Sequence, residues 1–323
     1  MLARIAHELF WLGRSVARAN HTARLLESVF HAQLEGQRAD PSAMTLSWDS
    51  LLAMTGASPP EDEPGPARQD ETIALLVADR TQPASIVASI NAAHERARAV
   101  RDVISLDMWE TINTFHMRVC QRDITPELRR EPSAVFDLVR ERCSLFWGVQ
   151  RRTMLHDDGW AFLNAGAELE AADIVVRMLR VTLPSAYGAD ENDSARDGPA
   201  LALLRAVGGL QAFRRAAAMS PHLVPVARFL LFESAFPDSI AACVEGLRSA
   251  LASADVAAHE ARPVLRLSRL AADLDFRRRE AAGVPGLLAT LEIAQRELAA
   301  VDGDISQRYF AGAERPALHV SFT

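Results

Sequence analysis

Helical periodicity is the feature that most restricts how this chain can fold. Apolar residues recur every three or four positions along most of the sequence, and almost no segment alternates apolar and polar residues as a strand would. The pattern therefore predicts an all-α fold. The predicted helices cover 2–34, 84–120, 133–150, 157–183, 200–218, 237–256, 261–282 and 286–309, with short helices near 48–54 and 72–78.

An internal repeat predicts that these helices form two related halves. The run from Leu9 to Gly13 aligns with the run from Phe162 to Gly166. Pro83-x-Ser85-Ile86 aligns with Pro237-x-Ser239-Ile240 at nearly the same offset. Two segments repeated in the same order indicate a duplicated helical unit. We therefore predict a helical bundle with a pseudo-two-fold arrangement.

The repeat also predicts how the chain is divided. Residues 1–150 form the first predicted repeat and residues 151–311 the second, and the two are expected to form one compact unit. Prolines, glycines and acidic residues gather in 57–70 and 184–199, which predicts two exposed loops. Residues 312–323 lack periodicity and are predicted to form a loose tail.

Composition excludes several function classes. A formal net charge of −7 over 323 residues argues against binding nucleic acid or a membrane surface through bulk positive charge. All 35 basic residues are arginine, which excludes Schiff-base chemistry, a P-loop lysine and a lysine base. Without a signal-peptide pattern, a membrane-spanning apolar run or paired cysteines, we expect a cytoplasmic protein.

The first predicted helix carries a cationic stripe along one face. Its members are three or four residues apart and are Arg4, His7, Trp11, Arg14, Arg18 and His21. Guanidinium groups bind carboxylates and phosphates through paired hydrogen bonds, so the stripe could bind an oxyanion or an acidic helix. A solvated helix face is the alternative. Gly13 and Gly166 lie inside predicted helices, which indicates a close approach between helices.

Two further polar sets follow helical spacing. The segment 84–120 carries Glu95, Arg98, Arg101, Glu110 and Asn113, and the second repeat carries Glu170 and Asp173. Ion pairs along one helix are the structural interpretation of the first set. Because the second repeat helix is acidic where the first is basic, we expect charge pairing between the halves in preference to a metal site. No metal-binding or nucleophile motif is present, and no cofactor is predicted.

At these residues the chain resembles the bacterial alpha-E domain family. The resemblance runs from Arg4-Ile5-Ala6 through Phe10-Trp11-Leu12-Gly13-Arg14, Thr22 to Leu26, Met108-Trp109-Glu110, Thr153-Met154-Leu155, Glu170, Asp173 and Arg177 to Phe236-Pro237. It implies a cytoplasmic bacterial protein encoded beside a circularly permuted ATP-grasp ligase and often a transglutaminase-like protease. It also implies a partner role in forming or modifying peptide or amide bonds, with ATP and Mg bound by the partner.

The chain departs from the family pattern in both repeats. The family usually reads Glu-Arg-Ala-Glu where this chain has Ala17-Arg18-Ala19-Asn20, and His7 replaces a common glutamate. In the second repeat Ala167 and Ala171 replace two arginines, although the acidic residues remain. The resemblance therefore implies either a specialised polar centre or a member that has lost the family activity.

Three interpretations of function remain open. In the first, the chain is a partner subunit that binds a substrate or anion through Arg4, His7, Trp11, Arg14, Arg18, Arg24, Arg98, Arg101, Asn113, Asp173 and Arg177. In the second, it is an enzyme whose general base is Glu170, Glu110 or Glu95. In the third, the polar sets only pair helices. Burial distinguishes them, because a catalytic carboxylate lies in a pocket and a docking surface is broad and exposed.

Overall fold

The computed structural model describes residues 1–39, 46–58, 68–186, 197–217, 219–255, 257 and 260–312. Every regular element in these ranges is a helix, which confirms the all-α prediction. Most of the loops predicted at 57–70 and 184–199, and nearly all of the tail predicted at 312–323, lie outside the described residues.

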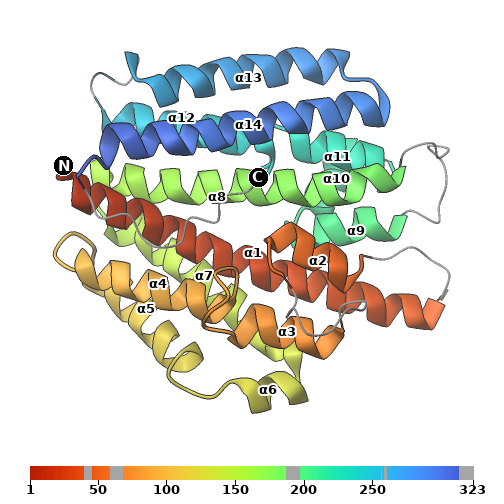
Figure 1. Cartoon of the computed structure of the whole chain (residues 1–323), viewed down its shortest axis with the longest axis horizontal. Helices are drawn as coiled ribbons and strands as arrows, with labels where there is room; N and C mark the ends of the chain where they lie inside the picture. The colour runs from red at the N-terminus through yellow and green to blue at the C-terminus, as the bar shows by residue number, and fades with distance from the viewer. Residues whose placement is uncertain are drawn as a thin grey trace.

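The helices lie in layers on either side of a central pair (Figure 1). The N-terminal helices are α1 (Ala3–Ala39), α2 (Trp48–Thr55), α3 (Gln69–Ala78), α4 (Ile86–Ala99), α5 (Leu106–Val119), α6 (Thr125–Arg130) and α7 (Pro132–Thr153). The C-terminal helices are α8 (Asp158–Thr182), α9 (Asp197–Ala206), α10 (Leu210–Ala217), α11 (Leu223–Phe232), α12 (Ile240–Ala254), α13 (Arg262–Glu280) and α14 (Gly283–Tyr309), with a 3₁₀ turn at Leu183–Ala186.

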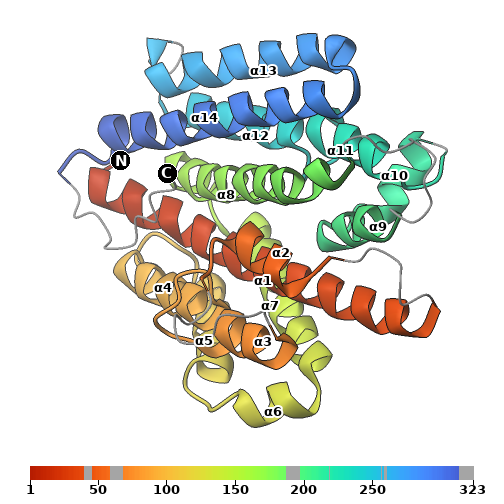
Figure 2. The same ribbon diagram turned by 45° about the vertical axis from the view of Figure 1, so that its right-hand side comes forward.

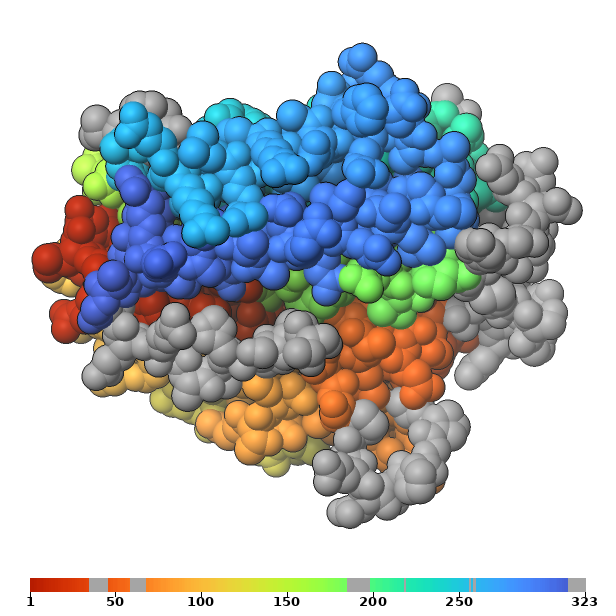
Figure 3. Space-filling model, turned by 45° about the horizontal axis from the view of Figure 1, so that its top comes forward, coloured from red at the N-terminus to blue at the C-terminus, as the bar shows by residue number. Residues whose placement is uncertain are grey.

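Helices α1 and α8 form the central pair and run side by side in the same direction (Figures 1 and 2). The amino group of Met1 lies 3.7 Å from the Asp158 carboxylate where both helices begin, and Arg18 meets Glu170 further along. Helices α4 and α7 pack on α1, and α12 and α14 pack on α8. On the face shown in Figure 3, α8 reaches the surface as a strip between α14 and α2.

Two glycines bring the backbones of α1 and α8 into contact. A Cβ atom added at Gly13 would overlap the carbonyl group of Leu163, and one added at Gly166 would overlap the carbonyl group of Phe10. No other residue lacks a Cβ, so only glycine permits this approach. The close approach predicted from the two glycines is confirmed.

The single helix predicted over 84–120 is wrong. Helix α4 ends at Ala99 and α5 begins at Leu106. The Ser105 hydroxyl accepts a hydrogen bond from the Met108 N–H at 3.1 Å, which caps the N-terminus of α5. The segment is therefore a hairpin of two helices that pack on each other.

The single helix predicted over 200–218 is also wrong, because the structure has two helices there, α9 and α10. Gly208 separates them with a φ of 67°, in the left-handed region that ends helices. Helices α6 and α11 were not predicted. Pro225 lies in the first turn of α11, where a backbone N–H would make no hydrogen bond within the helix, so proline is tolerated there.

None of the described helices has both the length and the apolar composition needed to cross a membrane. The three cysteines, Cys120, Cys143 and Cys243, are buried free thiols. Burial raises the pKa of Cys120 to about 12, so this side chain stays a protonated thiol at neutral pH.

We expect Gly166→Ala to destabilise the fold by about 1–3 kcal/mol, because the new Cβ atom would push α8 away from the Phe10 carbonyl group. Gly148→Ala in α7 is the matched control, since a Cβ there meets nothing within 4 Å. That change should be neutral or stabilise by up to about 1 kcal/mol. Urea unfolding measures the stability of both variants. Equal changes in the free energy of unfolding would contradict the close contact between α1 and α8.

Candidate functional site

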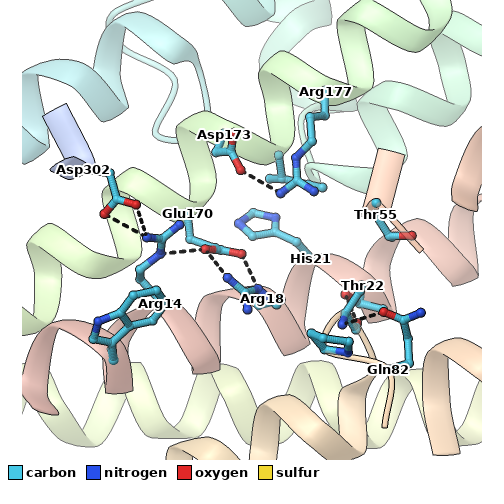
Figure 4. A pocket seen from close by; sticks show the side chains of 15 residues that line it. Arg14, Arg18, His21, Thr22, Thr55, Gln82, Glu170, Asp173, Arg177 and Asp302 are labelled. Carbon is cyan, nitrogen blue, oxygen red and sulfur yellow. Dashed lines mark hydrogen bonds and ion pairs between the residues drawn. The ribbon is translucent and has the colours of Figure 1, made fainter. Parts of the chain in front are cut away.

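Glu170 lies at the centre of a buried ion-pair cluster between α1 and α8 (Figure 4). Its side chain is 2% exposed. Its carboxylate accepts hydrogen bonds from Arg14 Nε at 2.9 Å, from Arg18 Nε at 2.5 Å and from Arg18 Nη2 at 2.9 Å. One buried carboxylate is therefore held by two guanidinium groups from the same face of α1, and the charge pairing predicted between these two helices is confirmed.

Arg14 extends the cluster to a third helix. Its Nη1 atom donates to both carboxylate oxygens of Asp302 in α14, each at 3.1 Å. Its guanidinium carbon lies 4.7 Å from the centre of the Trp11 ring, within the range of a cation–π interaction. Arg14 thereby links α1, α8 and α14.

The charges of the cluster are mutually stabilised. Burial alone would lower the pKa of Arg14, but Asp302 and Glu170 raise it above its usual value. Burial alone would raise the pKa of Glu170, but Arg18 and Arg14 hold it well below its usual value. Glu170 is therefore ionised at neutral pH, and its low pKa makes it a weak base.

A pocket of about 90 Å³ opens beside this cluster. Its polar lining comes from α1, α8 and α14, from the end of α2 and from residues 82–84. The labelled members in Figure 4 are Arg14, Arg18, His21, Thr22, Thr55, Gln82, Glu170, Asp173, Arg177 and Asp302. Arg177 Nη2 donates to the Asp173 carboxylate at 2.8 Å. Charged groups of both signs thus surround the pocket.

His21 lies in the pocket wall between Glu170 and Arg177 (Figure 4). It is 7% exposed, and its ring makes no hydrogen bond to the described residues. Burial lowers the pKa of His21, although Asp238 and Glu170 oppose this, so the imidazole is neutral at neutral pH. The sequence places His21 in the cationic stripe of the first helix, but His21 is not among the candidate site residues predicted from it.

The structure brings only part of the predicted site together. The predicted residues that line the pocket are Trp11, Arg14, Arg18, Glu170, Asp173 and Arg177. The solvated-face interpretation of the stripe is wrong, because Trp11, Arg14 and His21 are buried.

Three other predicted residues of α1 lie outside the pocket. Arg4 is exposed near the start of the helix. His7 is buried against Phe310 and contacts the Glu8 carboxylate at 3.2 Å. Arg24 packs against Gly208, on the side of α9. The stripe therefore extends beyond the pocket at both ends.

The polar residues of the α4–α5 hairpin also lie outside the pocket. Glu95 and Arg98 form an exposed i,i+3 ion pair, Arg101 lies over the Trp109 ring, and Asn113 contacts His94. Glu110 is exposed. Two of the three candidate general bases are thus separated from the buried cluster.

Asp302 was not predicted, because nothing in the local sequence of α14 distinguishes it from other surface acids. Its role becomes visible only where α14 packs against α8 and meets Arg14. Within the ranges that the structure describes, no group of three or more His, Cys, Asp or Glu side chains could hold a metal ion.

The fold and the site define an all-helical domain with an arginine–glutamate cluster between its central helices. The chain belongs to the Alpha-E family, whose model matches residues 1–310 and is described as a predicted alpha-helical domain with a conserved ER motif.

The chain is similar to two uncharacterized mycobacterial proteins, Mb2597 of Mycobacterium bovis and Rv2567 of Mycobacterium tuberculosis. Each is 26% identical over 275 residues, which is 80% of this chain and 31% of the relative. The chain thus spans about a third of the length of these curated relatives. No solved structure matches it.

We expect Glu170→Gln to lower the free energy of unfolding by about 3 kcal/mol or more, since Arg14 and Arg18 would keep their charges without the buried carboxylate that they share. Glu245→Gln is the matched control, because Glu245 pairs with Arg248 on the surface of α12 and is 55% exposed. Losing this exposed ion pair should lower the free energy of unfolding by about 0.5 kcal/mol or less. Chemical denaturation at pH 7 measures the free energy of unfolding of both variants, and similar losses would contradict the central role of Glu170.

The same variant should change the response to acid. Because the folded pKa of Glu170 lies below its usual value of 4.5, its contribution is complete above that pH and is lost as the pH falls further. Between pH 7 and pH 3 the wild type should therefore lose more stability than Glu170→Gln. Parallel losses in the two proteins would show that Glu170 is not held ionised by the arginines.

Proposed function

We propose that this protein is a helical partner subunit of an ATP-grasp-type ligase system that forms or modifies peptide or amide bonds. Its pocket between α1 and α8 would bind an oxyanion group of the substrate. The observation that carries the proposal is the pair Arg14 and Arg18, oriented by Glu170 in the pocket wall. Arg18 stays 24% exposed there, so part of its guanidinium group can reach a ligand.

The family relationship supports the partner role. Alpha-E domains are helical and are known in operons with ATP-grasp-type proteins. In the mycobacterial relatives, the segment similar to this chain is 31% of a longer protein, so it is joined there to other parts. ATP and Mg would be bound by the ligase in the cytoplasm, and a transglutaminase-like protein would be a second partner.

Burial favours ligand binding over docking for the cluster itself. Arg14 and Glu170 are at least nine-tenths buried, whereas a docking surface needs accessible side chains. The low pKa of Glu170 makes it a poor general base, and Glu95 and Glu110 lie outside the pocket. These features favour a binding role over a stand-alone enzyme.

We also infer that the chain arose by duplication, with residues 1–150 and 151–311 as the two copies. Helix α4 packs on α1 as α12 packs on α8, and α2 packs on α8 as α9 packs on α1. Ser85 and Ser239 each cap the following helix, and each donates a hydrogen bond to the carbonyl group six residues earlier. Gly13 and Gly166 make reciprocal contacts. Each feature fits a pseudo-two-fold axis between α1 and α8.

The partner role can be tested by co-expressing the chain with the ATP-grasp protein encoded beside it, followed by size-exclusion chromatography and ATP-turnover assays with amino acids and peptides. We expect co-elution and a turnover that depends on this chain. Arg18→Gln should lower turnover about tenfold, as expected for the loss of one charge-assisted hydrogen bond, while co-elution persists.

Arg248→Gln is the control, since Arg248 pairs with Glu245 on α12 and lies outside the pocket. It should leave both co-elution and turnover unchanged. A purely structural role for the cluster predicts that Arg18→Gln lowers only the thermal stability. Separate elution, with a turnover indifferent to this chain, would overturn the proposal.

A further inference from the structure

Positive and negative side chains are balanced among the described residues that line the pocket between α1 and α8. The guanidinium groups of Arg14, Arg18 and Arg177 are matched by the carboxylates of Glu170, Asp173 and Asp302. A lone phosphate or carboxylate would add negative charge to a partly buried and already neutral cluster, which is unfavourable. A ligand that carries both charges would leave the balance unchanged.

The charged side chains around the pocket differ in how accessible they are. The side chains of Glu170 and Arg14 are 2% and 10% exposed and are committed to each other. Arg18, Asp302 and Asp173 are 24%, 23% and 28% exposed. A ligand entering the pocket therefore meets the guanidinium groups of Arg18 on α1 and Arg177 on α8, and carboxylates on α8 and α14. Partly accessible groups of both signs suit an anionic and a cationic group on one small molecule.

His21 is an independent sign of a ligand. Its side chain is more than nine-tenths buried, it lines the pocket, and its ring makes no hydrogen bond to the described residues. Its nitrogen atoms are not among the fully buried atoms without a partner, so they are accessible from the pocket, where a ligand can hydrogen-bond to them. As a neutral ring it offers one donor and one acceptor, and it can contact either end of a zwitterion.

The size of the pocket limits the ligand further. Its volume of about 90 Å³ is well below the roughly 300–1,000 Å³ typical of sites that enclose drug-sized molecules. A nucleotide therefore does not fit inside it, whereas the ammonium and carboxylate groups around one carbon atom do.

We propose that this pocket binds a free α-amino acid. The ligand carboxylate contacts Arg18, the ammonium group contacts Asp302 or Asp173, and His21 hydrogen-bonds to the ligand between them. This inference rests on the proposed function only in treating the pocket as a ligand site, and it does not depend on the ligase.

Isothermal titration calorimetry on the full chain at pH 7 tests the inference. The probes are the standard L-amino acids, inorganic phosphate and, for the tightest-binding amino acid, its amide and its N-acetyl derivative. The amide lacks the carboxylate and the N-acetyl derivative lacks the ammonium group. We expect saturable binding of the amino acid and a loss of affinity of about tenfold or more for each derivative.

Three variants connect binding to the pocket. His21→Phe keeps an aromatic ring but removes both nitrogen atoms, and Asp302→Asn removes one negative charge while keeping an acceptor for Arg14. Each should weaken amino-acid binding about tenfold or more, and circular dichroism checks that each is folded. If His21→Phe does not fold, His21→Gln is used in its place. Arg248→Gln should bind as the wild type does.

The outcomes separate this inference from the proposed function. Phosphate or the N-acetyl derivative binding as tightly as the amino acid would show a simple anion site, which overturns the inference and leaves the proposed function standing. The absence of saturable amino-acid binding also overturns it. Amino-acid binding without co-elution or ligase-dependent turnover supports the inference and overturns the partner role.

Discussion

The ion pairs of Glu170 with Arg14 and Arg18 depend on the backbone contact between α1 and α8. A buried carboxylate is stable only when nearby cations and hydrogen bonds offset its lost hydration. Gly13 and Gly166 allow the helices to approach until the guanidinium groups of one reach the carboxylate of the other. Because α4 and α7 pack on α1, and α12 and α14 pack on α8, the positions of the outer helices follow from this central contact.

The same contact creates the pocket. Glu170 uses its lone pairs to orient two arginines, and Arg14 carries the connection to Asp302 in α14. The carboxylate is thus held as a permanent charge, which suits positioning of side chains and not proton transfer. What remains accessible is a set of charged groups of both signs around a neutral histidine.

The family is described by a conserved ER motif, and the central ion pair of this chain joins an arginine of α1 to a glutamate of α8. Neither α1 nor α8 contains a Glu-Arg dipeptide, since Ala17 precedes Arg18 and Ala171 follows Glu170. Arg18 and Glu170 nevertheless form an ion pair, while Ala17 and Ala171 are buried without charge. The polar centre between α1 and α8 is therefore a single charged cluster to which both helices contribute.

The sequence by itself determined the helical class, the shared face of Trp11, Arg14, Arg18 and His21, and the need for glycine at positions 13 and 166. These follow from periodicity and side-chain size, which are local properties of the chain. Only the tertiary structure decided that α4 and α5 form a hairpin, that Arg4 and Arg24 lie outside the pocket, and that Asp302 belongs to it. A helix face extends over many turns, but packing against α8 and α14 covers only part of it, and residues distant in sequence become neighbours only through that packing.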